Sequence, residues 1–271
     1  MFDLDAYLAR IRLPARPTLD HHGLQALHRA HRLSIPFENL DVALGRLIRI
    51  DSGSVFAKLV TGKRGGYCFE HNRLFADALA ALGFSARTVT GQVLLNGAPT
   101  PPGSHALQLV TLEGQDWIAD PGFGGSYAPP MSLEEGAEAI ATDGARFSLR
   151  REGDGWTLFR DGDPGTTDGR GAGTGSRPQY RFLLAEVTDA ALEASNDWVQ
   201  SAPGTRFVDH RVVSIVLPHG FARLTDRSYR RQVGTEVNEG EITDPRVYRM
   251  RLSLMFGIDL TRDEVMGQGL Y

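Results

Sequence analysis

The sequence predicts an α+β protein built from three consecutive segments. Up to about residue 84, apolar residues recur at helical spacings of three and four. From residue 85 the apolar pattern changes to a period of two, which is typical of strands. After about residue 190 both patterns occur. The predicted domains are therefore residues 1–84, which are helical, residues 85–190, which are β, and residues 191–271, which are mixed α/β.

The composition is that of an ordinary globular protein. A chain of 271 residues is long enough to bury a sizeable core, and its net charge of −4 gives no basic surface for nucleic acid. No apolar run reaches the length of a membrane span, and the acidic start Met1–Asp5 does not resemble a signal peptide. The single cysteine excludes an internal disulfide. We therefore expect a cytoplasmic protein with a reduced thiol and with no nucleic-acid or membrane partner.

The helical segment is expected to hold three helices before residue 62. The first covers Asp5–Ile11. The second follows an N-cap at Thr18 and ends at Pro36, which cannot continue a helix. Ser52 and Ser54 are the candidate N-caps of the third.

Four histidines near the second helix raise the question of a metal site. They are His21, His22, His28 and His31, of which the last two share a helix face. No cysteine or carboxylate completes a ligand set at a spacing typical of zinc. We therefore predict no metal and interpret these histidines as ordinary surface or core residues.

The only cysteine lies where a fourth helix is predicted to begin. Gly65 and Gly66 let the backbone turn tightly before Cys68, and the helical pattern then runs until Gly83. In a first helical turn, free N–H groups and the helix dipole favour a thiolate, and Arg64 adds a nearby positive charge. The stretch indicates a nucleophilic cysteine. The alternative interpretation is a buried, inert thiol.

The β segment is predicted to be a meander of short strands, which is typical of a small barrel or sandwich. The predicted strands cover residues 85–95, 105–110, 117–120, 146–151 and 155–160, and Asn96-Gly97 marks a turn. Residues 161–176 contain six glycines. We interpret them as a mobile surface loop, because no buried strand precedes them as in a dinucleotide site.

The last part of the chain alternates between the two kinds of element. Strands are predicted over residues 180–184, 211–217 and 223–237, and a helix over residues 190–199. Another helix is predicted to start at Thr243-Asp244-Pro245. Its expected buried stripe consists of Val247, Met250, Leu254 and Ile258.

A nucleophilic cysteine needs a base, and the base needs a group that orients it. His105 and Asp120 are the candidates, although a core histidine and a turn-capping aspartate are the alternatives. With a hairpin tip at Gly114 and Gln115, Asp120 lies opposite Leu109, on the same face as His105 but roughly 13 Å from it. Direct contact then requires another register, a bulge or strands that are not simple neighbours.

Four motifs together resemble the arylamine N-acetyltransferase family. They are Ile35–Leu40, Arg64–Asn72, His105 and Asp120–Gly125, in the order of the family. The resemblance spans most of the chain and is weaker after about residue 200. It implies an N-terminal helical bundle, a central β-barrel and a C-terminal α/β lid, and it implies a catalytic triad of Cys68, His105 and Asp120. His71, often glutamine in the family, and Pro121, usually a small apolar residue, depart from the pattern outside the triad.

The resemblance also implies an activity and a set of ligand contacts. It implies ping-pong transfer of an acetyl group from acetyl-CoA, through an acetyl-Cys68 thioester, to the nitrogen of arylamines, arylhydrazines or N-hydroxyarylamines, as in xenobiotic metabolism. The implied acceptor-site residues are Phe37, Phe69 and Phe123, and the implied coenzyme contacts are Ser104, Gly124, Gly125, Thr205 and Phe207. An amide synthase on the same fold, a cysteine hydrolase of transglutaminase or papain type, and a non-catalytic binding module are the alternatives. A homodimer is compatible with the sequence.

Overall fold

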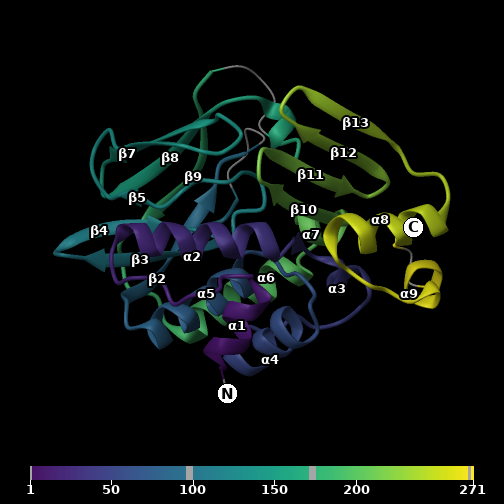
Figure 1. Cartoon of the computed structure of the whole chain (residues 1–271), viewed down its shortest axis with the longest axis horizontal. Coiled ribbons are helices and arrows are strands. Elements are labelled where there is room, and N and C mark those ends of the chain that lie inside the picture. Colours follow the sequence, from purple (N-terminus) through teal and green to yellow (C-terminus); the bar gives the residue numbers. More distant parts are fainter. Residues whose placement is uncertain (1, 96–99, 171–174, 268–269) are drawn as a thin grey trace.

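The computed structural model describes residues 2–95, 100–170, 175–267 and 270–271, and it shows helices packed beside two antiparallel sheets (Figure 1). The helices before the cysteine are α1 (Leu4–Arg10), α2 (His21–Ser34), α3 (Leu40–Ala43) and α4 (Ser52–Phe56), and α4 continues as a π-helical turn (Ala57–Thr61). The next helix is α5 (Cys68–Leu82). Helices α1, α2 and α4 correspond to the three helices predicted before residue 62, and α3 was not predicted. No helix within the described ranges is both long and apolar enough to cross a membrane.

Aspartates cap the second and fourth of these helices. Asp20 accepts a backbone hydrogen bond from the first turn of α2, and Thr18 instead donates its hydroxyl to Asp20. Asp51 caps α4, so Ser52 and Ser54 lie within the helix. The predicted caps were therefore wrong by one to three residues, because a carboxylate at each of these helix starts takes the free N–H groups.

A first sheet has eight strands and curls into an incompletely closed barrel. Its strands are β2 (Ser85–Val93), β3 (His105–Leu112), β4 (Gln115–Ala119), β5 (Met131–Ser132), β6 (Glu138–Ile140), β7 (Arg146–Glu152), β8 (Gly155–Asp161) and β9 (Arg177–Leu183). Their order is β5-β4-β3-β2-β9-β8-β7-β6. Apolar side chains from most of these strands, including Leu107, Phe147 and Tyr180, pack together inside the curl. This sheet confirms the predicted α+β fold with a central barrel.

The register of the β3–β4 hairpin differs from the predicted one. The turn is at Glu113–Gly114, where both residues have positive φ. Leu109 therefore pairs with Ile118 rather than with Asp120. This shift brings Asp120 two residues closer to His105 along the strands than the predicted register did.

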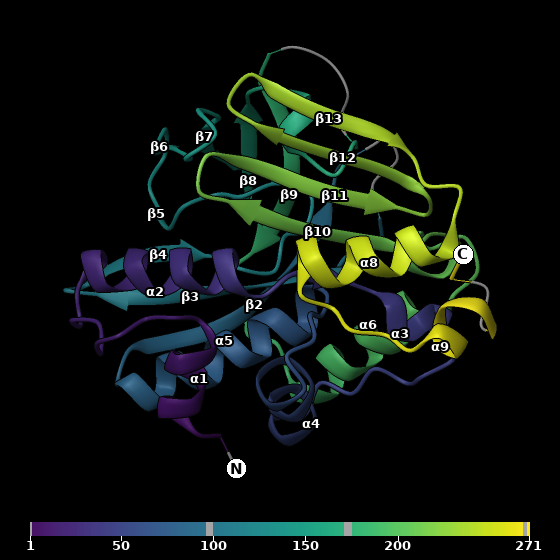
Figure 2. The same ribbon diagram turned by 45° about the vertical axis from the view of Figure 1, so that its right-hand side comes forward.

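The second sheet combines one strand from the first segment of the chain with four strands from the last segment. Its strands are β1 (Phe37–Glu38), β10 (Val212–Leu217), β11 (Gly220–Thr225), β12 (Ser228–Val233) and β13 (Glu236–Glu241), in that order. The helices of the last segment are α6 (Asp189–Ser201), α7 (Arg206–Asp209), α8 (Pro245–Phe256) and α9 (Arg262–Gly267). Figure 2 shows α8 beside β10. Because Phe37 of β1 pairs with Ser214 of β10, the first and last segments are joined directly. The division at residues 84 and 190 stays a prediction.

Helix α8 begins where predicted but buries a different face. Its buried side chains are Tyr248, Leu252 and Phe256, and Ile258 beyond it is also buried. The expected stripe of Val247, Met250 and Leu254 faces outward, with Leu254 80% exposed. Both faces are apolar, so the helical period alone could not select the buried one.

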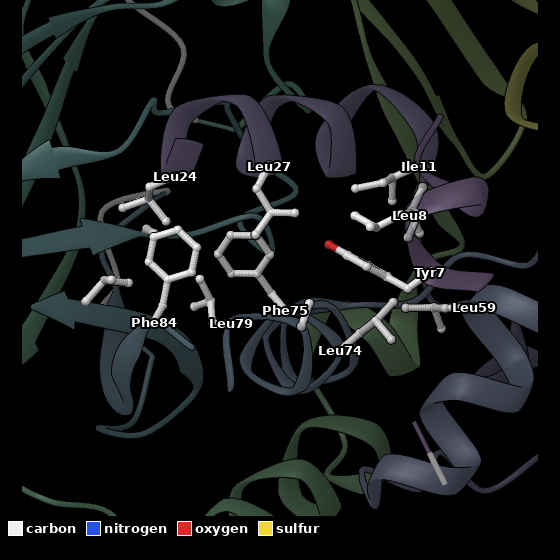
Figure 3. Close-up of a cluster of buried hydrophobic side chains, with 14 of the residues drawn as sticks. Tyr7, Leu8, Ile11, Leu24, Leu27, Leu59, Leu74, Phe75, Leu79 and Phe84 are labelled. Carbon is white, nitrogen blue, oxygen red and sulfur yellow. The ribbon is translucent and has the colours of Figure 1, made fainter. Parts of the chain in front are cut away.

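An apolar cluster between α1, α2 and α5 fixes the helix that carries the cysteine (Figure 3). Its labelled members include Tyr7, Leu27, Leu74 and Phe75, all fully buried. Figure 3 shows the ring of Tyr7 extending into this cluster with its hydroxyl oxygen at the inner end. Fully burying side chains of this size typically stabilises a fold by about 1.5–3 kcal/mol each, which holds α5 firmly in place.

The glycine-rich segment after β8 is partly built into the protein. Thr166, Thr167 and Asp168 are buried, and the backbone N–H of Asp168 donates to the carbonyl of Gly125 at 3.0 Å. The interpretation as a surface loop was therefore wrong for these residues. Residues 171–174 and the predicted Asn96-Gly97 turn lie outside the described residues.

Candidate active site

Cys68 is the first residue of α5 and is almost fully buried. Tyr67 is the N-cap residue, and its backbone N–H donates to the Glu70 carboxylate at 3.1 Å. The Tyr67 hydroxyl donates to Asn196 of α6. Gly83 ends α5 with φ of 93°, as predicted. The cysteine is thus fixed at a helix N-terminus whose flanking groups are themselves held by hydrogen bonds.

The two glycines before Cys68 serve close packing rather than a tight turn. A Cβ on Gly65 would lie 2.2 Å from the Pro36 carbonyl oxygen, and one on Gly66 would lie 2.7 Å from a Glu70 carboxylate oxygen. Neither glycine has positive φ. Without side chains there, β1 can lie against this loop, and the N–H of Glu38 donates to Gly66 at 2.8 Å. The predicted turn is replaced by a close backbone approach.

Arg64 belongs to a buried ionic network. Its guanidinium contacts Glu38 at 2.7 Å and Asp41 at 3.2 Å. Lys58 contacts both Asp41 and Glu70 at 2.8 Å. Burial raises the pKa of Glu70 to about 7, against the opposing effect of Lys58. The positive charge of Arg64, which the sequence analysis expected to act near Cys68, is therefore balanced by carboxylates.

The base and acid candidates are in direct contact. His105 is the first residue of β3, and Asp120 directly follows β4. His105 Nε2 lies 2.7 Å from Asp120 Oδ2, and both side chains are 2% exposed. The observed pairing of β3 with β4 brings Asp120 closer to His105 along the strands than the predicted pairing did. Asp120 lies just beyond the end of β4. The structure thus brings His105 and Asp120 together. Cys68 and His105 line one cavity, which is described below.

The electrostatics of this group favour a charged imidazole. Burial alone would lower the pKa of His105, but the Asp120 carboxylate, and secondarily the Cys68 side chain, raise it to about 10. Burial acts to raise the pKa of Asp120, but His105 together with hydrogen bonds from Asn72 and Gly122 holds it below its usual value. Because Nε2 is engaged by Asp120, the ring nitrogen left for Cys68 is Nδ1. The arrangement holds an imidazolium beside the sulfur at neutral pH.

Asn72 joins the three parts of this site, and the sequence analysis gave it no role. Its Nδ2 group lies 2.6 Å from the carbonyl of Ala106, and 3.2 Å from both the carbonyl of Cys68 and Oδ1 of Asp120. One amide thus connects α5, β3 and the acid. Its spacing of four residues from Cys68, which places both on one helix face, was a usable signal.

Arg32 holds the loop that follows Asp120. Its buried guanidinium donates to the carbonyl of Pro121 at 2.8 Å and to that of Phe123 at 3.3 Å. It also lies 5.8 Å from the ring centre of Tyr127. The sequence gives no signal that Arg32 holds this loop, because its partner at Pro121 is a backbone carbonyl 89 residues away in the chain.

A cavity of about 290 Å³ opens onto Cys68 and His105. The predicted ligand-contact residues that line it are Phe37, Ser104, Phe123, Gly124, Thr205 and Phe207. Arg170, Trp198 and Arg206 also line it and were not predicted. Phe69 instead lines a separate cavity with Ile50 and Arg73, and Gly125 packs near Arg170 without lining the cavity at Cys68. The structure therefore gathers most, but not all, of the predicted contacts.

The glycines of the 122–125 loop are required by neighbouring protein groups. A Cβ on Gly122 would lie 2.4 Å from Nδ2 of Asn72 and 2.8 Å from the carbonyl of Cys68. A Cβ on Gly124 would lie 2.4 Å from the ring of Phe37. These glycines let the loop touch α5 and β1.

The histidines near α2 serve packing and hydrogen bonding. His31 contacts Tyr7 and His71, and His21 stacks on Trp117 at 5.7 Å between ring centres. Within the parts of the chain that the structure describes, no group of three or more histidine, cysteine and acidic side chains is arranged to hold a metal ion.

Comparison with known proteins identifies the class of enzyme first. Residues 20–265 match the sequence model of the N-acetyltransferase family, so the protein is an acetyltransferase. Arylamine N-acetyltransferase from Escherichia coli (strain K12) is 37% identical over 219 residues, which cover 80% of this chain and 74% of that protein. The arylamine N-acetyltransferase / N-hydroxyarylamine O-acetyltransferase of Salmonella typhimurium is 35% identical over 263 residues, covering 94% and 88%. The chain belongs to the arylamine N-acetyltransferase family, as the sequence motifs indicated.

Solved structures agree with this assignment. The arylamine N-acetyltransferase of Salmonella typhimurium superposes with a TM-score of 0.89 at 30% identity, over 98% of this chain and 97% of that one. The Mycobacterium marinum arylamine N-acetyltransferase in complex with CoA has a TM-score of 0.87 at 28% identity, over 98% of each chain. The whole fold is therefore shared with these enzymes.

Proposed function

We propose that the protein transfers an acetyl group from acetyl-CoA to the nitrogen of an arylamine, an arylhydrazine or an N-hydroxyarylamine by a ping-pong mechanism. The observation that carries the proposal is the 2.7 Å contact of Asp120 with His105, which lines the same cavity as Cys68. It supplies a sulfur nucleophile, a base and a group that orients the base. The names of the relatives support the arylamine nitrogen as acceptor, whereas for N-hydroxyarylamines the name of the Salmonella typhimurium relative gives transfer to oxygen.

In the first half-reaction, the Cys68 sulfur, whose proton already rests on His105 Nδ1 in the charged pair, attacks the thioester carbonyl of acetyl-CoA. The new carbon–sulfur bond forms as the bond to the sulfur of coenzyme A breaks, and the departing thiolate receives the proton from His105. Asp120 keeps the imidazole oriented and stabilises its charged form. Because one thioester replaces another, this exchange is nearly balanced in energy.

In the second half-reaction, the amine nitrogen attacks the carbonyl of acetyl-Cys68. The carbon–nitrogen bond forms as the bond from the acetyl carbon to Cys68 breaks. His105 takes the proton from nitrogen, so the thiolate of Cys68 and the imidazolium of His105 are restored. The aromatic walls that face the cysteine, Phe37 and Phe123, suit a flat aromatic acceptor. Water competes with the amine for this thioester, so a covered site is needed.

The rest of the cavity fits a coenzyme donor. Ser104, Gly124, Thr205 and Phe207 all line it. Arg170 and Arg206 supply positive charge for phosphate groups, and the related Mycobacterium marinum enzyme is described in complex with CoA. We propose that Phe69 and Gly125 shape these walls from behind and do not touch a ligand. Residues 191–271 are the proposed lid, and those of them that line the cavity are Trp198, Val199 and residues 204–207.

The decisive experiment is mass spectrometry of the protein mixed with acetyl-CoA. Wild type is expected to gain about 42 daltons on Cys68, and the Cys68→Ala variant to gain nothing and to lose acetyl transfer. Retained transfer in that variant would overturn the mechanism. Release of more than one equivalent of thiol per protein without amine would indicate a hydrolase, and no adduct on wild type would indicate a binding module. A panel of amine substrates distinguishes an arylamine N-acetyltransferase from an amide synthase on the same fold. Gel filtration tests whether the protein is a homodimer, and cell fractionation tests whether it is cytoplasmic.

A further inference from the structure

Three buried side chains form a continuous hydrogen-bonded chain behind the acceptor wall. The Tyr7 hydroxyl lies 3.0 Å from His31 Nδ1, and His31 Nε2 lies 2.8 Å from His71 Nδ1. His71 Nε2 lies 3.1 Å from the carbonyl oxygen of Pro36. The three side chains come from α1, α2 and α5, and all are fully buried. Figure 3 shows the Tyr7 hydroxyl pointing into the interior where this chain begins.

The carbonyl at one end fixes the direction of every hydrogen bond in the chain. Because the Pro36 oxygen can only accept, His71 must carry its proton on Nε2. Nδ1 of His71 then accepts from Nε2–H of His31, and Nδ1 of His31 accepts from the Tyr7 hydroxyl. Burial lowers the pKa of His71 to about 3 and that of His31 well below its usual value, so both rings stay neutral near pH 7.

The chain ends at the peptide that leads into Phe37. The Pro36 carbonyl accepts a second hydrogen bond, from the Gly66 N–H at 3.3 Å, so both of its lone pairs are used. The His71 ring also stacks on Phe37, with an interplanar angle of 9° and 6.2 Å between ring centres. Gly124 packs closely against the ring of Phe37. Phe37 is therefore held through its backbone and by two ring contacts.

We propose that Tyr7, His31 and His71 are positioning residues that set the place of Phe37 in the acceptor wall and thereby the affinity for the aromatic amine. This inference rests on the function proposed above. None of the three side chains lines the cavity at Cys68, and Phe37 is the lining residue that the chain reaches, through the Pro36 carbonyl and the stacked His71 ring. The effect is expected in the second half-reaction, because attack on acetyl-CoA depends on Cys68 and His105.

The test compares His71→Leu with His71→Gln. A glutamine amide can donate to Pro36 through its NH₂ group and accept from His31 through its oxygen, whereas leucine can do neither. In a ping-pong reaction, kcat/KM for acetyl-CoA reports acetylation of Cys68 and kcat/KM for the amine reports its transfer. We expect His71→Leu to lower the amine value about tenfold or more through KM, with the acetyl-CoA value within about twofold of wild type. His71→Gln is expected to restore most of the loss.

Two outcomes overturn the inference: an unchanged amine kcat/KM in His71→Leu, or an equal fall in both values, which would mean that the change disturbs Cys68 itself. Failure of wild type to form acetyl-Cys68 would instead defeat the proposed function. If His71→Leu does not fold, Tyr7→Phe is compared with Tyr248→Phe, whose hydroxyl has no hydrogen-bond partner among the described residues. Only Tyr7→Phe is expected to raise KM for the amine, and equal effects of the two would refute the inference.

Nitrogen-15 NMR of the histidine rings gives a readout that a merely structural role would not move. In wild type, His31 and His71 are both expected to carry their proton on Nε2 and to show no titration between about pH 6 and 8. In Tyr7→Phe the His31 signal is expected to shift, since Nδ1 loses its donor. A wild-type His71 protonated on Nδ1 would contradict the hydrogen-bond direction and the inference with it.

Discussion

Replacing Asp120 with asparagine tests the electrostatic basis of the site. Oδ1 of Asp120 accepts from the Gly122 N–H at 2.9 Å and from Asn72 Nδ2 at 3.2 Å. The amide oxygen of the variant must keep these contacts, so its NH₂ group faces His105 Nε2. That nitrogen must then accept, which moves the ring proton to Nδ1, the atom that faces Cys68. The variant ring can no longer take the proton of the thiol.

The size of the effect follows from the pKa of His105. The surroundings of this buried ring, chiefly Asp120, raise that pKa from 6.5 to about 10, which is roughly 5 kcal/mol of preference for the charged ring at about 1.4 kcal/mol for each tenfold change. Without the carboxylate, burial acts largely unopposed and lowers the pKa. The imidazolium that stabilises an anionic sulfur is then scarce at pH 7. We expect alkylation and acetylation of Cys68 to slow by about 10³-fold.

The assay is the rate of Cys68 alkylation by iodoacetamide between pH 5.5 and 9.5, followed by mass spectrometry, with release of coenzyme A in a single turnover as the second measurement. Wild type is expected to react at a nearly constant rate from pH 7 to 9, and Asp120→Asn only as the pH rises. Asp226→Asn, which alters a partly exposed His–Asp contact with His210, is the matched control and should change neither rate. Alkylation of folded Asp120→Asn at pH 7 within threefold of wild type would refute the reasoning.

Three further predictions concern the free energy of unfolding, measured with urea. Gly124→Ala is expected to cost about 1–3 kcal/mol and to raise KM for the amine, whereas Gly240→Ala, with no atom within 4 Å of the new Cβ, should be neutral. Because burial raises the pKa of Glu70 from 4.5 to about 7, its stabilising protonated form is lost as pH rises through that window. Wild type should therefore lose roughly 3 kcal/mol relative to Glu70→Gln between pH 4.5 and 8. Leu252→Ala should cost about 2–5 kcal/mol and Leu254→Ala less than about 0.5, and equal costs would contradict the assigned face of α8.

The kinds of element and their order could be predicted from the sequence because their signals are local. The apolar period marks α5, and Gly83 ends it at a positive φ that glycine adopts without strain. Asp244 and Pro245 mark the start of α8 in the same way. The change to a period of two at residue 85 coincides with the start of β2. None of these inferences needs knowledge of a distant partner.

Register and buried faces could not be predicted, because distant contacts decide them. The tip of the β3–β4 hairpin is at Glu113–Gly114 and not at the predicted Gly114–Gln115. The alternation of apolar and polar residues does not distinguish these two registers. Helix α8 offers two apolar faces, and only the five-stranded sheet selects the one with Leu252. Phe69 and Phe37 look equivalent beside their motifs, yet only Phe37 reaches the catalytic cavity.

The candidate site itself was reachable through motifs, whereas its supporting groups were not. The residues made His105 and Asp120 candidates, and the family resemblance implied that they act together, although the predicted register had kept them apart. Asn72 and Arg32 stabilise the site by contacts to backbone carbonyls on other elements. A polar side chain can serve such a purpose at almost any position, so its identity alone does not reveal it.

The site shows why close packing and chemistry are inseparable in this protein. Asn72 can hold Asp120 only because Gly122, which lacks a Cβ, lets the loop approach α5 closely. Asp120 can orient His105 only while its other oxygen is held by Asn72 and Gly122. A side chain added at residue 122 would therefore displace the Asp120 carboxylate without contacting any substrate. On this argument Gly122→Ala should resemble Asp120→Asn in the alkylation assay, although it removes no ionisable group.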